Sequence, residues 1–375
     1  MAVMKGRLRS LFPGGNTSQG FYSFYDNIVE PGANKIFVIK GGPGVGKSTL
    51  MRTIGNEMLE KGYDVEFLRC SSDPASLDGV YFPELDIALI DGTFPHIVDP
   101  KNPGAVDEIV HLGDYWNEDK LRKSKPYVLA DNKKIAKYYK IAYSYLQEAK
   151  VIHDRIESYY TDSMNFGLVN KKIDEICQEI FPNNLANLER NELAKQRHMF
   201  ITAITPEGFI SETANLLNNV ETLYVLKGEP GTGKSTLCSR VAVLAQQKGF
   251  ATELYHCPID PEKLDALLIP ELKIAIINGT PPHSYNLKTA STLTNLKVIN
   301  LNDYLDYNNL EPFQKEIAED KEKFDLAIDK AIEFLKKAKK MHDHLESYYI
   351  SAIDFDKINE VRKKILERIL ELSKS

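Results

Sequence analysis

The chain repeats itself, and this duplication limits the folds open to it more than any other feature. When Ile36–His96 is aligned with Leu223–His283 at a constant offset of 187 residues, 28 of the 61 positions are identical without a gap. Matches of this extent at a fixed offset indicate a duplicated domain, so both copies must adopt one fold. Shorter matches extend the repeat, pairing Thr17 with Thr205 upstream and Glu157–Tyr160 with Glu346–Tyr349 downstream.

The seam between the two copies falls within Phe181–Gln196, where Pro, Asn and charged residues cluster. We therefore predict two domains, residues 1–188 and residues 189–375. A chain of 375 residues is long enough for each domain to bury a core of its own.

Each copy has the pattern of a strand, a glycine-rich loop, a helix, further strands and then long helices. Ile36–Ile39 is a short apolar run before the glycines, and the segment after them places apolar residues at every fourth position up to Gly62, as expected of a helix. Ile87–Ile90 is apolar throughout, which is typical of a strand covered on both faces in a parallel sheet. The sequence predicts the α/β class, with each domain a mainly parallel sheet flanked by helices and followed by a long helical C-terminal extension.

The helical extensions leave two interpretations open. Apolar residues step by three and four positions from Ile135 to Tyr159, and the series from Phe324 to Tyr348 repeats that register. In the first interpretation each long helix lies on its own domain. In the second the two helices pack together in the manner of a coiled coil and join the halves. The charged positions do not select between them.

The glycine-rich loops have the same spacing in both copies. Gly41–Ser48 reads GGPGVGKS and Gly228–Ser235 reads GEPGTGKS, so both satisfy G-x-x-x-x-G-K-[ST] between a strand and a helix. Such a loop wraps backbone N–H groups around phosphate at the positive end of a helix dipole. Its lysine reaches the β- and γ-phosphates, and its serine holds Mg²⁺. The predicted nucleotide-binding residues are Gly41, Gly42, Pro43, Gly44, Val45, Gly46, Lys47, Ser48 and Thr49 in the first copy and Gly228, Glu229, Pro230, Gly231, Thr232, Gly233, Lys234, Ser235 and Thr236 in the second.

In these motifs the chain resembles the P-loop NTPase superfamily, and it is most similar to tandem P-loop ATPases. The resemblance covers the sheet portion of both halves and implies two P-loop NTPase domains that bind ATP or GTP with Mg²⁺. It also implies an Asp at the end of an apolar strand, where it orients water around the metal. Asp91 matches this element, although an Asp before Gly92 also suits a turn, and the equivalent residue in the second copy is Asn278. The expected metal-binding residues are Ser48, Asp91 and Ser235.

Acidic residues after this strand are distributed unequally. Asp99, Asp107 and Glu108 follow Asp91 in the first copy, whereas no Asp or Glu occurs between Glu271 and Asp303 in the second. Hydrolysis needs a carboxylate or another base to position the attacking water. Our candidates are Glu108, Asp99 and His96, with the alternative that His96 and its equivalent His283 only fix their loops by hydrogen bonds. The predicted catalytic residues are Lys47, Asp91, Glu108 and His96.

Two further repeated pairs have no assigned role. Asp73 and Asp260 follow the second strand of each copy, where they either cap a helix or face the nucleotide or a second substrate. His153 and His342 lie on the long helices without a partner pattern, so we do not expect a metal there.

The leading functional hypothesis is Mg²⁺-dependent ATP hydrolysis at the first site, with the second site binding nucleotide for regulation or structure. One alternative is a small-molecule or nucleotide kinase, although such enzymes usually carry several arginines in a lid and this chain has eleven in all. The other is a nucleotide-dependent sensor or scaffold without catalysis.

Bulk properties exclude several other classes. The net charge of −6 gives no general affinity for nucleic acid or anionic membrane, and no apolar run approaches the roughly 18 residues of a membrane span. The four cysteines show no CxxC spacing, so we expect a reduced, cytoplasmic protein. A protein partner is left open by the sequence.

Overall fold

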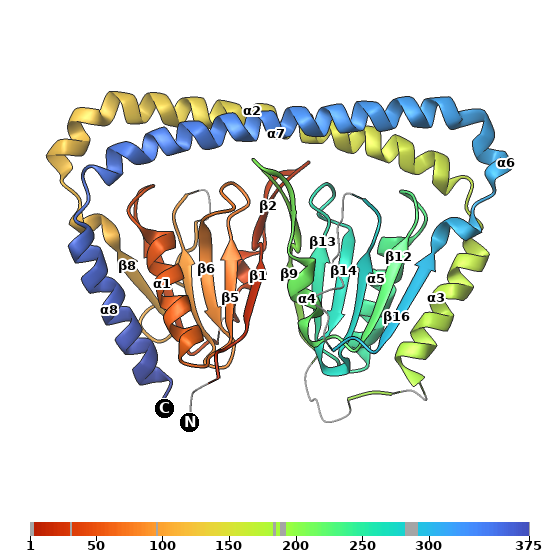
Figure 1. The fold of residues 1–375 in the computed structure, drawn as a ribbon, viewed down its shortest axis with the longest axis horizontal. Coiled ribbons are helices and arrows are strands. Elements are labelled where there is room, and N and C mark those ends of the chain that lie inside the picture. The colour runs from red at the N-terminus through yellow and green to blue at the C-terminus, as the bar shows by residue number, and fades with distance from the viewer. Residues whose placement is uncertain are drawn as a thin grey trace.

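The computed structural model describes residues 4–30, 32–94, 97–182, 185–187, 193–281 and 292–374. Two six-stranded sheets stand side by side beneath a pair of long helices (Figure 1). The predicted α/β class is confirmed. In spatial order the first sheet contains β1 (Leu8–Leu11), β5 (Val65–Arg69), β6 (Leu77–Phe82), β7 (Ile87–Asp91), β4 (Lys35–Lys40) and β8 (Asp107–His111).

The second sheet repeats the first strand for strand. Each of its strands occupies the place of the equivalent strand in the first sheet, so the two copies share one strand order, as the duplication requires. In the same spatial order it contains β9 (Gln196–Met199), β13 (Thr252–His256), β14 (Leu264–Ile269), β15 (Ile274–Asn278), β12 (Thr222–Lys227) and β16 (Asn295–Asn300).

Both sheets are mixed, with parallel pairs in the majority. In the first sheet β1 pairs parallel with β5, and β4 pairs parallel with both β7 and β8. Strand β6 runs antiparallel to its two neighbours, β5 and β7. This strand was not among those predicted, because Asp78 and Gly79 interrupt its apolar pattern. The antiparallel strand matters for the site, since it brings Asp78 next to the end of β7.

A helix follows each glycine-rich loop directly: α1 (Lys47–Glu60) in the first copy and α5 (Lys234–Gln247) in the second. As predicted, α1 buries Leu50, Ile54 and Met58 against the sheet. It ends just before Gly62, whose φ of +95° lies in the left-handed region that favours glycine.

The long helices are α2 (Glu118–Thr161) and α7 (Gln314–Ile350), and they pack against each other along the top of the view in Figure 1. The rings of Tyr145 and Phe334 stack across this contact, and Arg155 donates to Asp320 at 2.6 and 2.8 Å. The interpretation that the helices join the two halves is therefore confirmed. Within the described ranges, no helix has the length and apolarity needed to cross a membrane.

Each long helix passes from its own half to the other. After α2 the chain continues into α3 (Phe166–Ile180), which packs in the core of the second sheet (Figure 1). After α7 it continues into α8 (Phe355–Leu372), which packs in the core of the first. Each core is thus completed by a helix from the other copy.

Equivalent residues of the two copies meet across the centre of the molecule. Phe12 and Phe200 exchange backbone hydrogen bonds, each N–H donating to the other carbonyl at 3.0 Å. Arg197 donates to Glu66 at 2.6 Å, and the equivalent pair, Arg9 and Glu253, is hydrogen-bonded in the same way. Such reciprocal contacts are the signature of a two-fold relation. The two copies are therefore related by a pseudo-two-fold axis at this contact.

Short elements fill the space between the sheets and the long helices. Two hairpins, one from each copy, lie there and touch each other. The hairpins are β2 (Gly14–Thr17) with β3 (Gly20–Ser23) and β10 (Thr202–Thr205) with β11 (Gly208–Ser211). Of the short helices, α4 (Thr213–Leu216) contacts β1, and α6 (Tyr307–Leu310) precedes α7.

Candidate functional site

The first glycine-rich loop joins the end of β4 to the start of α1. Gly46, with φ of +90°, is the residue from which the helix begins, so the N–H groups of the first helical turn point toward the loop. The Lys47 ammonium donates to the carbonyls of Gly41 and Gly42 at 2.8 and 2.9 Å. It also lies 3.5 Å from the carboxylate of Asp91. The lysine is thereby held over the loop rather than extended into solvent.

The second glycine-rich loop repeats this arrangement. Lys234 donates to the carbonyls of Gly228 and Glu229 at 2.6 and 2.8 Å. Burial lowers the pKa of Lys234 to about 8, although the charges of Asp265 and Glu229 oppose the change. A phosphate beside this ammonium would favour its charged form, because an opposite charge raises the pKa of a lysine.

Asp91 holds the turn after its strand, and it also lies beside the loop lysine. Its carboxylate accepts a hydrogen bond from the Thr93 N–H at 2.9 Å, which fixes the turn after β7. It also faces Lys47, because β7 and β4 are parallel neighbours whose carboxyl ends meet at the loop. In the second copy Asn278 accepts from the Thr280 N–H at 3.1 Å and donates to Asp265 at 3.0 Å.

A second acid lies beside each loop, and it was not among the predicted site residues. Asp78 on β6 and Asp265 on β14 are buried, and the strand register puts them next to Asp91 and Asn278 respectively. The residue before each acid, Leu77 or Leu264, donates its backbone N–H to the loop serine at 2.9 Å in both copies. The sequence feature that points to these two acids is the Leu-Asp pair, which is repeated at an offset of 187 residues. It had no assigned role because β6 was not recognised as a strand.

Other candidate residues lie apart from the loops. Glu108 sits in the body of β8, where it pairs with Lys35 at 3.2 Å and with Arg368. The Arg368 hydrogen bond holds the pKa of Glu108 below its usual value despite partial burial. Asp99 is exposed and pairs with Lys40 at 3.2 Å. His96 and His283 lie outside the described residues.

Asp73 and Asp260 bind the crossing helices rather than cap a helix. Asp73 lies 3.4 Å from Lys339 of α7, and Asp260 lies 3.3 Å from Lys150 of α2. Each pair joins a loop at the edge of one sheet to the long helix that comes from the other copy.

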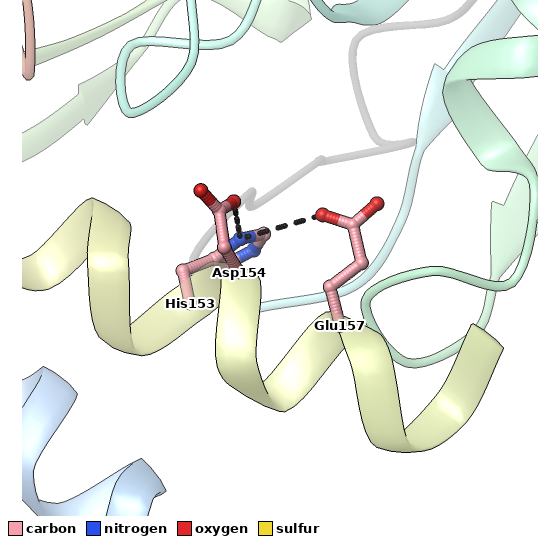
Figure 2. A group of neighbouring side chains, drawn as sticks. All are labelled: His153, Asp154 and Glu157. Atoms are coloured by element: carbon pink, nitrogen blue, oxygen red, sulfur yellow. Dashed lines mark ion pairs between the residues drawn. The ribbon is translucent and has the colours of Figure 1, made fainter. Parts of the chain in front are cut away.

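The same turns of the long helices carry a repeated His-Asp-x-x-Glu pattern. Figure 2 shows the first of these, His153, Asp154 and Glu157, on one side of α2. The His153 Nδ1 atom lies 4.0 Å from Asp154 and 3.9 Å from Glu157. In the equivalent group on α7, His342 lies 3.5 Å from Glu346. Burial lowers the pKa of both histidines, so both favour the neutral form.

These helix turns contact the glycine-rich loops directly. A Cβ on Gly44 would lie 3.0 Å from the Glu346 carbonyl oxygen, and one on Gly231 would lie 2.6 Å from the Glu157 carbonyl oxygen. Both glycines also have positive φ, +69° and +81°. Any larger residue is therefore excluded by backbone strain and by contact with the helix of the other copy.

A large cavity of about 1540 Å³ opens beside the second loop. Its walls come from the loop, α5, the C-terminal part of α2 and the N-terminal half of α7. Lys234, Ser235 and Asp265 line one part of it, together with His153 and Glu157 from α2. Apolar side chains, including Phe209, Phe324 and Ile328, line another part.

Comparison with protein-family models, with curated proteins and with solved structures finds no match to this chain. The chemistry of the two loops is therefore the basis for assigning a function. That chemistry is a buried ammonium, a serine hydroxyl and one or two carboxylates around the start of a helix.

Proposed function

We propose that the protein binds a nucleoside triphosphate with Mg²⁺ at both glycine-rich loops and hydrolyses it at the first. The observation that carries this proposal is the placement of Lys47 and Lys234. Each ammonium is held over its own loop by two loop carbonyls, at the N-terminus of a helix. Backbone N–H groups, a helix dipole and a fixed ammonium together favour a polyphosphate.

The neighbouring residues suit the metal that accompanies such a ligand. Mg²⁺ prefers oxygen ligands and usually keeps several waters. At the first loop Ser48, Asp91 and Asp78 would hold the ion, directly or through water, and the ion would neutralise charge on the phosphates. At the second loop Ser235 and Asp265 remain, but Asn278 brings no charge. We assign the second site to regulation or structure for this reason.

Nucleotide-dependent stabilisation tests the binding proposal. A ligand that binds only the folded state adds about 2.7 kcal/mol of stability at a hundredfold excess over its Kd. We expect ATP with Mg²⁺ to raise the melting temperature, and the double variant Lys47→Ala/Lys234→Ala to lose that rise. The matched control is Lys61→Ala/Lys248→Ala, which removes one lysine from the end of each loop-following helix. An unchanged shift in the loop double variant would contradict the proposal.

A second candidate function, phosphoryl transfer to a small molecule, is favoured by the size of the cavity. Its volume of about 1540 Å³ exceeds the roughly 300–1,000 Å³ of a typical single-ligand pocket. Phosphate release from ATP alone supports hydrolysis, whereas ATP consumption only with an added acceptor supports a kinase. Tight binding with neither reaction supports a nucleotide sensor, whose signal would pass through the long helices.

A further inference from the structure

The crossing of the long helices brings residues of each copy to the loop of the other. On α7, from the second copy, the turn at Glu346 touches Gly44 of the first loop. On α2, from the first copy, Glu157 lines the same cavity as Lys234 of the second loop. The two glutamates begin the repeated segments Glu157–Tyr160 and Glu346–Tyr349.

We propose that each triphosphate site is completed by the helix of the other copy, and that Glu346 is the proton acceptor for the attacking water at the first site. The inference rests on the proposed function, because it assumes a triphosphate at the first loop. It also supplies the water-activating residue that Glu108, held by Lys35 and Arg368, does not provide.

Several observations place Glu346 at the right point. Its side chain is half-buried, and it belongs to the helix turn that contacts Gly44. Burial raises the pKa of Glu346, and the charges of Lys339 and Lys47 only partly offset that rise. A Cβ on Gly44 would lie 3.1 Å from the Cβ of Glu346, so the glutamate side chain leaves the helix next to the loop. A carboxyl with a raised pKa is a better proton acceptor than an ordinary one.

The reaction balances with these residues. The water oxygen bonds to the γ-phosphorus while one water proton moves to the Glu346 carboxylate. The bond between the γ-phosphorus and the bridging oxygen breaks, and its electron pair stays on the nucleoside diphosphate. Lys47 offsets the developing negative charge, and Glu346 then releases its proton to solvent.

At the second site the equivalent glutamate, Glu157, has a different partner. Lys263 donates to the Glu157 carboxylate at 2.7 Å, and the equivalent of Lys263 in the first copy is Ser76. Ser76 donates to Asp73 instead, at 2.9 Å. The Glu157 carboxylate is thus occupied by an ion pair, and we assign it to shaping the cavity.

Replacing Glu346 tests the inference. With ATP and Mg²⁺, we expect Glu346→Gln to lower phosphate release by at least about 100-fold, the usual contribution of a general base. The nucleotide-induced rise in melting temperature should persist, because the loop is unchanged. Glu333→Gln is the matched control: it makes the same change on an exposed position of α7, and we expect turnover as in the unmodified chain.

Adding a positive charge near Glu346 is a second test of the inference. Ser76→Lys gives the first copy the residue found in the second, so we expect turnover to fall about tenfold while nucleotide binding persists.

The pH dependence of turnover is a third test of the role of Glu346. Glu346 must be ionised to accept a proton, so turnover should fall as the pH drops through its pKa, and Glu346→Gln should lack that fall. The charged groups around Glu346 that contribute to this limb are His342, Lys339, Asp343, Asp73 and Lys47.

The outcomes separate the two proposals. Unchanged turnover in Glu346→Gln would overturn the role of Glu346 and leave nucleotide hydrolysis standing. Nucleotide-induced stabilisation without any phosphate release from the unmodified chain would also overturn that role, while leaving nucleotide binding intact. Neither stabilisation nor release would overturn the proposed function, and the inference with it.

Discussion

The two glycine-rich loops are alike in their backbone and differ in the charges around it. Both hold their lysine by the same two carbonyls, and both serines accept a hydrogen bond from the same position on the neighbouring strand. Three of these differences lie close to the loops, at equivalent positions where the first copy has one residue and the second another. These pairs are Asp91 and Asn278, Ser76 and Lys263, and Gly42 and Glu229.

Two of these residues in the second copy form ion pairs with the long helices. Glu229 adds an acid to the loop, and Lys321 of α7 pairs with it at 3.0 Å. Lys263 pairs with Glu157 of α2 in the same way. The second copy thus has Asn278 in place of the Asp91 carboxylate, and it has ion pairs that tie the loop region to the long helices. The two copies share the geometry of the loop, while the charges around it differ between them.

The largest expected effect separates the two lysines. Lys47→Ala should lower phosphate release by about 100- to 1,000-fold, since removal of one preorganised charge that stabilises a transition state has that magnitude. Lys234→Ala should leave the turnover at the first site within a few-fold of the unmodified rate. Steady-state phosphate release, with circular dichroism to show that both variants are folded, makes the comparison. Equal losses would show that the two sites are equivalent.

At the interface between the halves, equivalent substitutions in the two copies should instead have similar effects on stability. Glu66 is buried and accepts from Arg197 at 2.6 Å, and Arg9 lies 3.6 Å away. Burial would raise the pKa of Glu253, but the charges of Arg9 and Arg197 outweigh it and hold that pKa below its usual value. Glu66→Ala should cost about 3 kcal/mol of stability, because it leaves a buried guanidinium without its partner.

Urea denaturation measures the loss of stability in Glu66→Ala, and two further variants provide the comparison. Glu253→Ala should cost a similar amount if the pseudo-two-fold relation extends to energetics. Glu60→Ala removes an exposed partner of Lys5 and should cost less than about 1 kcal/mol. A cost for Glu66→Ala as small as that of Glu60→Ala would mean that the central ion pairs do not hold the halves together.

The sequence predicted the parts of this structure that depend on local pattern. The strand before each loop, the helix after it and the buried strand at Ile87–Ile90 all follow from apolar periodicity and glycine positions. Strand β6 could not be predicted in this way, because Asp78 and Gly79 stand where apolar residues would be expected. Asp78 instead lies beside Asp91, at the end of the sheet that meets the loop.

The crossing of the helices lay beyond what periodicity can determine. The apolar series from Ile135 to Tyr159 shows that a helix has a buried face but not which domain covers it. The decisive contacts are between copies, such as Lys339 with Asp73 and Lys150 with Asp260. Because the copies are so alike, the sequence does not show on which half each helix end packs. Which half it reaches depends on the length and direction of the two antiparallel helices.

The smallest expected effect comes from exchanging the residues that distinguish the two strand ends. Asp91→Asn gives the first site the residue of the second, and it should lower Mg²⁺-dependent phosphate release by about tenfold, or roughly 1.4 kcal/mol of transition-state stabilisation. The loss is expected to be smaller than for Lys47→Ala, since Asp78 still supplies a carboxylate and Asn still accepts from the Thr93 N–H. The reciprocal Asn278→Asp should strengthen the Mg²⁺ dependence of nucleotide binding at the second site, because it places a second carboxylate next to Asp265. Titration of nucleotide-induced stabilisation against Mg²⁺, in a Lys47→Ala background that silences the first site, isolates that response. An Asp91→Asn variant with full turnover would show that Asn278 suffices for the chemistry, and the difference between the sites would then lie in the lysine that holds Glu157.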